Sequence, residues 1–182
     1  MKTLKQIKKD AWSAYEEGKT RAGAVAYLRK LGYERKGKGL FAIVMIHPEN
    51  ERYVIRCARS QSRALTDAFP WYAQAVEREW IVSKYAPKIY AVHDDGSMSV
   101  TVVERCYPLR DRKFKSKAQN TQSVLRHGAL SYHFSDSELF KRGKVREFLE
   151  NVSQYGALDI GGPNIMQRKN GHPVFTDPIV GD

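Results

Sequence analysis

The first part of the chain has the apolar spacing of two helices. Residues 2–18 alternate basic and apolar positions at helical intervals, and Gly18 is suited to end this helix. A second apolar stripe begins after Thr20 and ends at Gly32. These patterns predict two helices before the first strand.

The pattern then changes to that of β-strands. Residues 33–46 and 52–58 are rich in β-branched and aromatic residues, and a Pro48-Glu49-Asn50 turn separates the two runs. They predict two antiparallel strands, with a Gly-x-Gly at Gly37 and Gly39 in the opening turn.

Helical spacing returns from Arg63 to Lys84, where Pro70 must mark an N-terminal turn or a break. The runs 88–93 and 97–104 then predict a hairpin, because Asp95-Gly96 supplies the positive backbone dihedrals of a tight turn. The order of elements is therefore strands, helix, strands.

The second half of the chain begins irregularly. Residues 105–123 are basic and polar with no period, which predicts a crossover or flexible loop. A helix is expected from Ser135 or Asp136 to Gly156, followed by a hairpin about Lys169-Asn170-Gly171. The predicted segments are an N-terminal helical segment (1–32), a sheet with a helix (33–104) and a C-terminal region (105–182).

Length and composition restrict the class of protein. The chain has 182 residues, 42% of them hydrophobic and 11% aromatic, which is enough to build a core. A large multidomain machine and wholesale disorder are excluded. We predict an α+β fold, either as one domain or as two small lobes around a shared cleft.

Basic residues are concentrated in two parts of the chain, whose overall net charge is +11. Residues 1–38 hold eleven Lys and Arg against four Asp and Glu, and residues 105–117 hold six against one. Such charge raises the local concentration of phosphate-rich or acidic partners, so nucleic acid is one candidate partner. A solvated charge run is the alternative interpretation of 105–117.

Other features concern metals and membranes. The two cysteines, Cys57 and Cys106, have no metal-ligand spacing, and the five histidines lie far apart in sequence, so a zinc site is not expected. The N-terminus lacks a signal-peptide core, and no apolar run could span a bilayer. We expect a soluble intracellular protein with reduced cysteines and no membrane partner.

Three residues near the end of the chain suggest phosphoryl transfer. Asp159 and Asn164 are separated by four residues, and Asp177 follows the expected hairpin. Phosphoryl transfer needs a carboxylate to orient the attacking hydroxyl, which Asp159 could do, and oxygen ligands for Mg²⁺, which Asn164 and Asp177 could supply. The alternative is that all three residues only serve turns.

The chain resembles the protein kinase-like superfamily, and most closely the early-gene serine/threonine protein kinases of T7-type short-tailed bacteriophages. The likeness covers about residues 31–180 and is most specific in LDIGGPNIMQRKNGHPVFTDPI at the end. Four earlier blocks also carry it: GYERKGKGLFAIVMIHPENERYVIRCA, DAFPWYA, PKIYAV and VTVVE. The resemblance implies a reduced two-lobe kinase-like fold with an antiparallel N-lobe sheet and a truncated helical C-lobe. It also implies bound ATP and Mg²⁺ and a hydroxyl-bearing protein substrate.

The resemblance also assigns nucleotide-binding roles. Gly37 and Gly39 would form the turn that covers the phosphates, and Glu104 would end the strand at the adenine-binding hinge. Arg56 stands where the family has the lysine that grips the α- and β-phosphates. The carboxylate partner of Arg56 stays open. Glu77 and Glu79 lie on the following helix, where an exposed face is the alternative role of both, whereas the segment that best matches the family lies nearer Asp67. Ordinary hairpin and strand-end roles are the alternatives for the glycines and Glu104.

Several positions depart from the family pattern. Arginine is longer and planar, so Arg56 is expected to weaken nucleotide binding or the rate. Leu158 replaces the arginine of many kinase catalytic motifs, Gly161 stands where phage relatives tend to have histidine, and Asp177-Pro178 replaces Asp-Phe-Gly. The sequence ends five residues after Asp177, so we expect no activation segment and substrate docking on other surfaces.

Three functions follow from these observations. The first is an ATP- and Mg²⁺-dependent kinase of the host cytoplasm that acts on Ser or Thr of host proteins; by resemblance its targets include RNA polymerase or a ribonuclease. The second is a catalytically impaired pseudokinase that holds and inhibits a host protein or nucleic-acid complex through its basic surface. The third, a small-molecule phosphotransferase, ranks last because no residues remain to build a helical substrate pocket.

Overall fold

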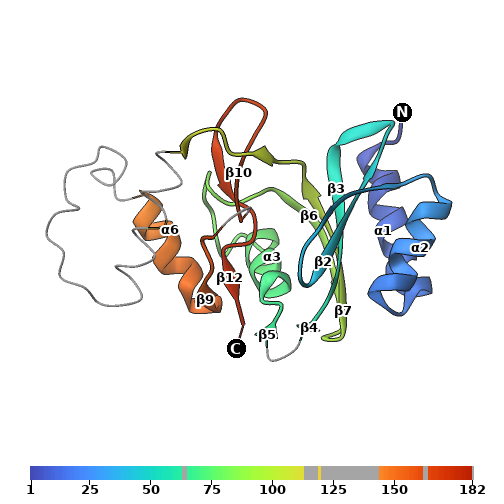
Figure 1. The fold of residues 1–182 in the computed structure, drawn as a ribbon, viewed down its shortest axis with the longest axis horizontal. Coiled ribbons are helices and arrows are strands. Elements are labelled where there is room, and N and C mark those ends of the chain that lie inside the picture. The colour runs from blue at the N-terminus through green and yellow to red at the C-terminus, as the bar shows by residue number, and fades with distance from the viewer. Residues whose placement is uncertain (63–64, 113–118, 120–143, 162–163, 182) are drawn as a thin grey trace, which may run out of the picture. The chain divides into compact units, whose positions relative to one another are not determined.

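The computed structural model describes residues 1–62, 65–112, 119, 144–161 and 164–181 (Figure 1). The chain forms two compact units. The first unit comprises Met1–Trp80, Lys88–Arg105 and Gly181–Asp182, and the second comprises Ile81–Pro87 and Cys106–Val180. The helices of 1–32 thus share a unit with the sheet, whereas 81–87 groups with the C-terminal region. The fold is α+β with an antiparallel sheet, as predicted.

The first unit is built on a five-stranded antiparallel sheet with strand order β1-β2-β3-β7-β6. Its strands are β1 (Glu34–Lys38), β2 (Ala42–His47), β3 (Asn50–Arg59), β6 (Ile89–Asp94) and β7 (Met98–Glu104). Since β7 pairs with β3, the last hairpin returns to the middle of the sheet. The predicted order of strands, helix, strands is confirmed.

The single strand predicted over 33–46 is wrong, because this run folds into two strands. The backbone N–H of Gly39 donates to the carbonyl of Ala42 (2.8 Å) and closes a turn between β1 and β2. The Gly-x-Gly of the opening turn lies here, but β1 contains no apolar residue that would indicate a strand before it. Consequently Arg56 lies on the third strand of the sheet, not the second.

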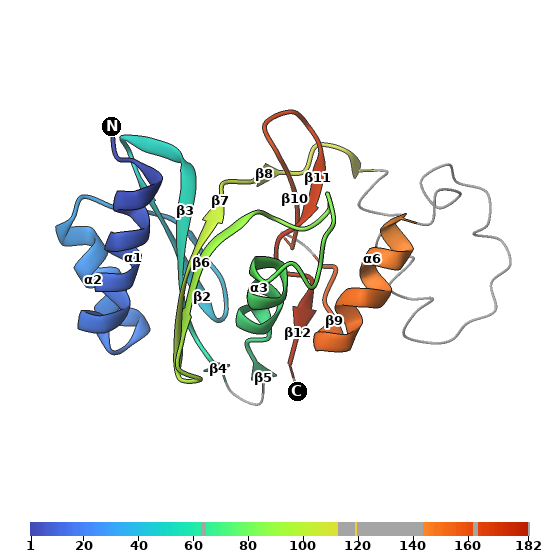
Figure 2. The ribbon, with the colours of Figure 1, turned by 180° about the vertical axis from the view of Figure 1, so that it is seen from behind.

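Helices α1 (Leu4–Gly18) and α2 (Arg21–Lys30) cover one face of this sheet, and α3 (Phe69–Glu77) lies on the other (Figures 1 and 2). Both predicted N-terminal helices are confirmed. Thr3 and Gln6 form a reciprocal capping box at the start of α1, and Thr20 caps α2. The buried side chains between these helices and the sheet include Ile7, Ala11, Leu28, Met45, Ile55, Val100 and Val102.

Two glycines let α1 and α2 approach closely. A Cβ on Gly23 would overlap the carbonyl oxygen of Gly18, and a Cβ on Gly18 would overlap the backbone of Ala24. The left-handed residue after α1 is Lys19 (φ 54°). Gly18 is therefore required for the close approach of two backbones, while the αL position that ends the helix is the next residue.

Helix α3 is shorter than the predicted span of 63–84. Two short strands, β4 (Gln61–Ser62) and β5 (Leu65–Thr66), precede it. Pro70 lies in the first turn of α3, so of the two predicted alternatives, an N-terminal turn or a break, the first is confirmed. At its end Glu79 adopts a left-handed conformation (φ 59°) and Trp80 donates its N–H to Ala75. This reversal stops the helix where the apolar spacing suggested that it continued.

The second unit holds short strands and one described helix. Its elements are β8 (Tyr107–Pro108), α6 (Lys144–Val152), the 3-10 helix η2 (Ser153–Tyr155), β9 (Ala157–Leu158), β10 (Ile165–Gln167), β11 (Pro173–Phe175) and β12 (Ile179–Val180). Strand order is β11-β10-β8 in one sheet and β12-β9 in the other. The predicted hairpin at 169–171 is confirmed, with Gly171 at φ +84°.

The predicted helix from Ser135 or Asp136 is confirmed where it is described. Val145, Phe148, Leu149 and Val152 of α6 form its buried stripe, and Gly156 follows η2. Its proposed start at 135–136, and most of the predicted loop 105–123, lie outside the described residues. Part of that loop is regular, because Tyr107–Pro108 pairs with β10. In the described portion of the chain no helix is long and apolar enough to cross a membrane.

Replacing Gly23 with alanine tests the contact between α1 and α2. Helix propensity alone predicts that Gly23→Ala stabilises the protein by about 1 kcal/mol. Because the new methyl would overlap the Gly18 carbonyl, we instead expect a loss of about 1–3 kcal/mol in the free energy of unfolding. Urea denaturation measures the change, and Ala26→Ser, at an exposed position of α2, is the control. A more stable Gly23→Ala variant would contradict the close approach.

Candidate functional site

Asp159 and Asn164 are in direct contact in the loop between β9 and β10. The side-chain amide of Asn164 donates to the Asp159 carboxylate oxygen Oδ2 (3.0 Å) and to the Asp159 backbone carbonyl (2.9 Å). The backbone N–H of Asn164 donates to the carbonyl of Gly161 (3.0 Å). These bonds fix the orientation of the Asp159 carboxylate, which is half-buried.

Residues next to Asp177 bind both of these residues. The N–H and hydroxyl of Thr176 donate to the Asn164 carbonyl (2.8 and 3.2 Å), and the Asp159 N–H donates to the Pro178 carbonyl (2.8 Å). The pairing of β9 with β12 continues this contact. The three residues predicted for phosphoryl transfer therefore belong to one hydrogen-bonded part of the second unit.

Gly161 leaves room for the Asp159 side chain. A Cβ at position 161 would lie 3.3 Å from Asp159 Oδ1, which is tighter than an ordinary contact. The resemblance expected histidine at this position. A larger residue here would have to shift the carboxylate, so the glycine permits the position that Asp159 has in this structure.

This arrangement offers oxygen donors to a hard cation. Asn164 uses its amide N–H groups on Asp159, so its Oδ1 is the atom that remains for a cation. Asp177 contributes a carboxylate, and oxygen ligands suit Mg²⁺. No group of three or more His, Cys, Asp or Glu residues that could hold a metal ion occurs in the described ranges. The candidate set here is smaller, with one carboxylate, Asp177, and one amide oxygen, Asn164 Oδ1.

Arg56 on β3 forms a buried ion pair with Asp67, just before α3. Its two terminal nitrogens donate to the two Asp67 carboxylate oxygens (2.8 and 2.9 Å), and the side chains are 8% and 2% exposed. The guanidinium carbon lies 4.1 Å from the centre of the Phe69 ring, and Asp67 also accepts the Phe69 N–H (3.3 Å). Of the carboxylates left open by the sequence, the structure pairs Arg56 with Asp67, and Glu77 and Glu79 are exposed.

The other predicted nucleotide-binding residues also lie in the first unit. Gly37 is part of β1, and Gly39 is in the turn that follows. Glu104 ends β7, where its N–H donates to the Lys88 carbonyl (2.9 Å) and its carboxylate accepts the Lys88 N–H (2.8 Å). Recognition of adenine through the Glu104 N–H would require this pair to open.

Cys57, next to Arg56 in sequence, faces the opposite side of the sheet. It packs in the core beneath α1 and α2. Burial raises the pKa of the Cys57 thiol to about 12, although the Arg56 charge acts in the other direction. At neutral pH this thiol is protonated, so it is a core residue and not a nucleophile.

Sequence reasoning missed two residues that complete these arrangements. Thr176 holds the Asn164 backbone, and its only sequence signal is its position beside Asp177. Phe69 lies against the Arg56 guanidinium, and an aromatic residue two positions after Asp67 was the available signal. In both contacts the two residues are distant from each other in sequence, so the contact depends on the fold.

Comparison with known proteins does not identify a family. No family model matches this sequence, and a search of curated proteins finds no match.

The buried ion pair gives a stability prediction. Asp67→Ala leaves the Arg56 charge buried without that carboxylate, so we expect a loss of about 3–5 kcal/mol in the free energy of unfolding. The control is Glu150→Ala, which removes the exposed Arg146–Glu150 pair of α6 and should cost about 0.5 kcal/mol or less. Denaturant unfolding followed by circular dichroism measures both. Similar losses in the two variants would contradict the importance of the Arg56–Asp67 pair.

Proposed function

We propose that this protein is a protein kinase-like phosphotransferase of a phage, which transfers the γ-phosphate of ATP to Ser or Thr of host proteins in the host cytoplasm. The observation that carries the proposal is the contact of Asp159 with Asn164 in the loop before the β10–β11 hairpin, with Asp177 at the end of that hairpin. Kinases use an Asp and an Asn with this spacing in the catalytic loop, followed by a metal-binding Asp. By resemblance, RNA polymerase or a ribonuclease are candidate substrates.

Asp159 has the role of orienting the attacking hydroxyl. Its carboxylate accepts the hydrogen bond of a Ser or Thr hydroxyl and takes the proton as the oxygen bonds to phosphorus and the bond to ADP breaks. Asn164 keeps the carboxylate in one orientation through the bond to Oδ2. The remaining oxygen, Oδ1, lies on the side that Gly161 leaves open.

The donor set fits Mg²⁺. Asn164 Oδ1 and the Asp177 carboxylate would hold the ion, which neutralises charge on the ATP phosphates when bound. The Thr176 bonds to the Asn164 backbone support this assignment, because they fix the residue that precedes Asp177 against the loop that carries Asn164.

The first unit supplies further support. Kinases carry the phosphate-binding lysine on their third strand and pair it with a carboxylate of the following helix. In this chain a cation, Arg56, occupies the third strand and pairs with Asp67, two residues before α3. Gly37 and Gly39 lie at the preceding hairpin, where the lack of side chains lets the backbone approach phosphates closely.

Substitution of the metal-binding and catalytic carboxylates should have different effects. Asp177→Asn should abolish the stabilisation by ATP and Mg²⁺, which at an ATP concentration about 100 times Kd adds about 2.7 kcal/mol. Asp159→Asn should retain this stabilisation but lower phosphate transfer by about 10²–10⁴-fold. Thermal shift and calorimetry with and without Mg²⁺ measure binding, and radiolabelled ATP with host lysate measures transfer.

Glu150→Gln, which removes an exposed carboxylate of α6, is the matched control and should behave as the wild type. Transfer by Asp177→Asn at the wild-type rate would refute the catalytic assignment. Absence of ATP binding by the wild type at millimolar concentration would refute the kinase function itself.

The second candidate is a pseudokinase that binds and inhibits a host protein or nucleic-acid complex, and a specific observation favours it. Both terminal nitrogens of Arg56 are engaged by Asp67, and the residue is 6% exposed. A guanidinium held in this way should bind phosphates weakly, because phosphate binding would break the buried ion pair.

A pull-down from host lysate separates the two macromolecular targets of the pseudokinase. Binding to nucleic acid should weaken steeply as ionic strength rises and should disappear after nuclease treatment. Binding to a protein through an aromatic and aliphatic interface should persist in both conditions. Retention of one host protein by the wild type and equally by Asp177→Asn, without transfer, would support the pseudokinase over the kinase.

A further inference from the structure

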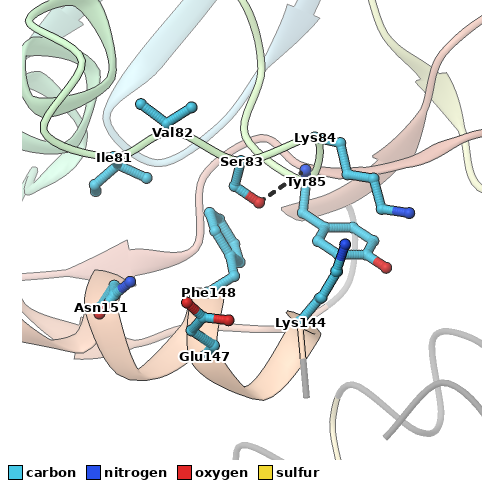
Figure 3. A pocket seen from close by; sticks show the side chains of 9 residues that line it. All are labelled: Ile81, Val82, Ser83, Lys84, Tyr85, Lys144, Glu147, Phe148 and Asn151. Carbon is cyan, nitrogen blue, oxygen red and sulfur yellow. Dashed lines mark hydrogen bonds between the residues drawn. The ribbon is translucent and has the colours of Figure 1, made fainter. Parts of the chain in front are cut away.

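A pocket lies between α6 and the segment 81–85 in the second unit (Figure 3). It has a volume of about 390 Å³, which is large enough for one or two amino-acid side chains. Its lining residues are Ile81, Val82, Ser83, Lys84, Tyr85, Lys144, Glu147, Phe148 and Asn151. None of them is a candidate catalytic or nucleotide-binding residue.

One wall of the pocket is rigid although it has no regular secondary structure. Arg168 donates from its two terminal nitrogens to the carbonyls of Lys84 (2.6 Å) and Ala86 (2.9 Å). The Tyr85 N–H donates to the Ser83 hydroxyl (3.2 Å), and the Tyr85 carbonyl accepts the Phe175 N–H (2.8 Å). The Tyr85 ring stacks on His172 at 5.5 Å. A pocket held in this way is formed before any ligand binds, which lowers the entropy cost of binding.

The two ends of the pocket differ in charge. Figure 3 shows the ammonium groups of Lys84 and Lys144 at the end where the Tyr85 ring lies, and Glu147 and Asn151 toward the other end with Phe148. Lys84 lies 5.2 Å from the Tyr85 ring centre. Neither lysine has an ion-pair partner among the residues that the structure describes. Within the described part of the chain, an anionic group can therefore bind at this end without displacing a carboxylate.

The remainder of the pocket favours an apolar group and disfavours a second anion. Phe148 and Ile81, which are 3% and 6% exposed, form the apolar floor, and Val82 at the rim, 83% exposed, supplies most of the accessible apolar surface. Glu147 would repel the next charge of a regularly charged polymer such as RNA. A ligand that fits has one carboxylate followed by an aliphatic or aromatic side chain, and the net charge of +11 favours encounters with acidic proteins.

We propose that this pocket docks an acidic and apolar segment of a protein partner, with a carboxylate between Lys84 and Lys144 and the neighbouring apolar side chain against Phe148. The inference rests on the proposed function only in that the partner is a protein. It supplies a docking surface for that partner outside the residues assigned to phosphate transfer, and it serves the kinase and the pseudokinase equally.

Fluorescence anisotropy with the full chain tests the proposal. The probe is a labelled dodecapeptide that alternates Glu and Asp with Leu and Phe, at physiological ionic strength and without ATP. We expect saturable binding that weakens by about tenfold or more when the acids become amides or when Leu and Phe become Ser. Hydrogen exchange should show protection by the peptide in residues 81–87 and 144–152.

Charge-matched variants locate the anionic end. Lys144→Gln and Lys84→Gln should each weaken binding by about tenfold. Lys169→Gln makes the same charge change at the exposed turn of the β10–β11 hairpin and should leave affinity unchanged. Val82→Ser, at an exposed position that does not threaten the fold, should weaken binding of the mixed peptide but not of the peptide that lacks Leu and Phe.

Four results would overturn the proposal. These are the lack of saturable binding by the mixed peptide, an equal loss of affinity in Lys169→Gln, protection confined to other residues, and displacement of the peptide by a single-stranded RNA oligomer through the same lysines. Because no nucleotide is present, failure of this docking site and failure of the ATP-binding assignment are measured separately.

Discussion

The first unit depends on the buried ion pair between Arg56 and Asp67. Taking two charges out of water is costly, and the structure offsets this cost by a two-bond contact and by the Phe69 ring over the guanidinium. The pair joins the central strand β3 to the start of α3. It therefore fixes the position of the helix on one face of the sheet, while the apolar core beneath α1 and α2 holds the other face.

The second unit is organised by backbone hydrogen bonds around Asn164 and Asp159. The Asn164 side chain binds Asp159, its carbonyl accepts two bonds from Thr176, and the Asp159 N–H reaches the carbonyl of Pro178. The buried apolar side chains of α6, β10 and β11 form the core of this unit. The same bonds that hold this short-stranded unit together thus also orient the polar side chains that carry the proposed chemistry.

Much of the secondary structure could be predicted because its causes are local. Helical spacing and Thr20 predicted the helices of the first 32 residues, and the glycine turns at 96 and 171 predicted two hairpins. Gly37 and Gly39 indicated a turn within 33–46, but the strand before this turn had no signal, because β1 (Glu34–Lys38) contains no apolar residue. The end of α3 depends on a left-handed Glu79, a conformation that this residue type does not suggest.

The candidate site was predictable in part for a similar reason. Asp159, Asn164 and Asp177 stand in a fixed spacing around a hairpin, so their proximity followed from the chain itself. The choice of Asp67 over Glu77 as the partner of Arg56 required the fold, since both carboxylates lie near α3 in sequence. The pocket beside α6 also had no signal, because its walls come from residues about 60 positions apart that contacts of Arg168, Phe148 and Phe175 bring together in the fold.

The arginine at position 56 is less free than a lysine would be to bind a carboxylate and a phosphate at the same time. A lysine ammonium can keep one bond to a carboxylate and turn another toward a phosphate, whereas a guanidinium committed through both ends to Asp67 gains stability by giving up that freedom. Under the proposed kinase function, stability of the first unit and affinity for nucleotide would depend on the same side chain. The proposed docking pocket beside α6 does not include Arg56, so a chain without transfer activity would still be able to hold a protein there. The two proposed functions therefore differ in the use of one residue.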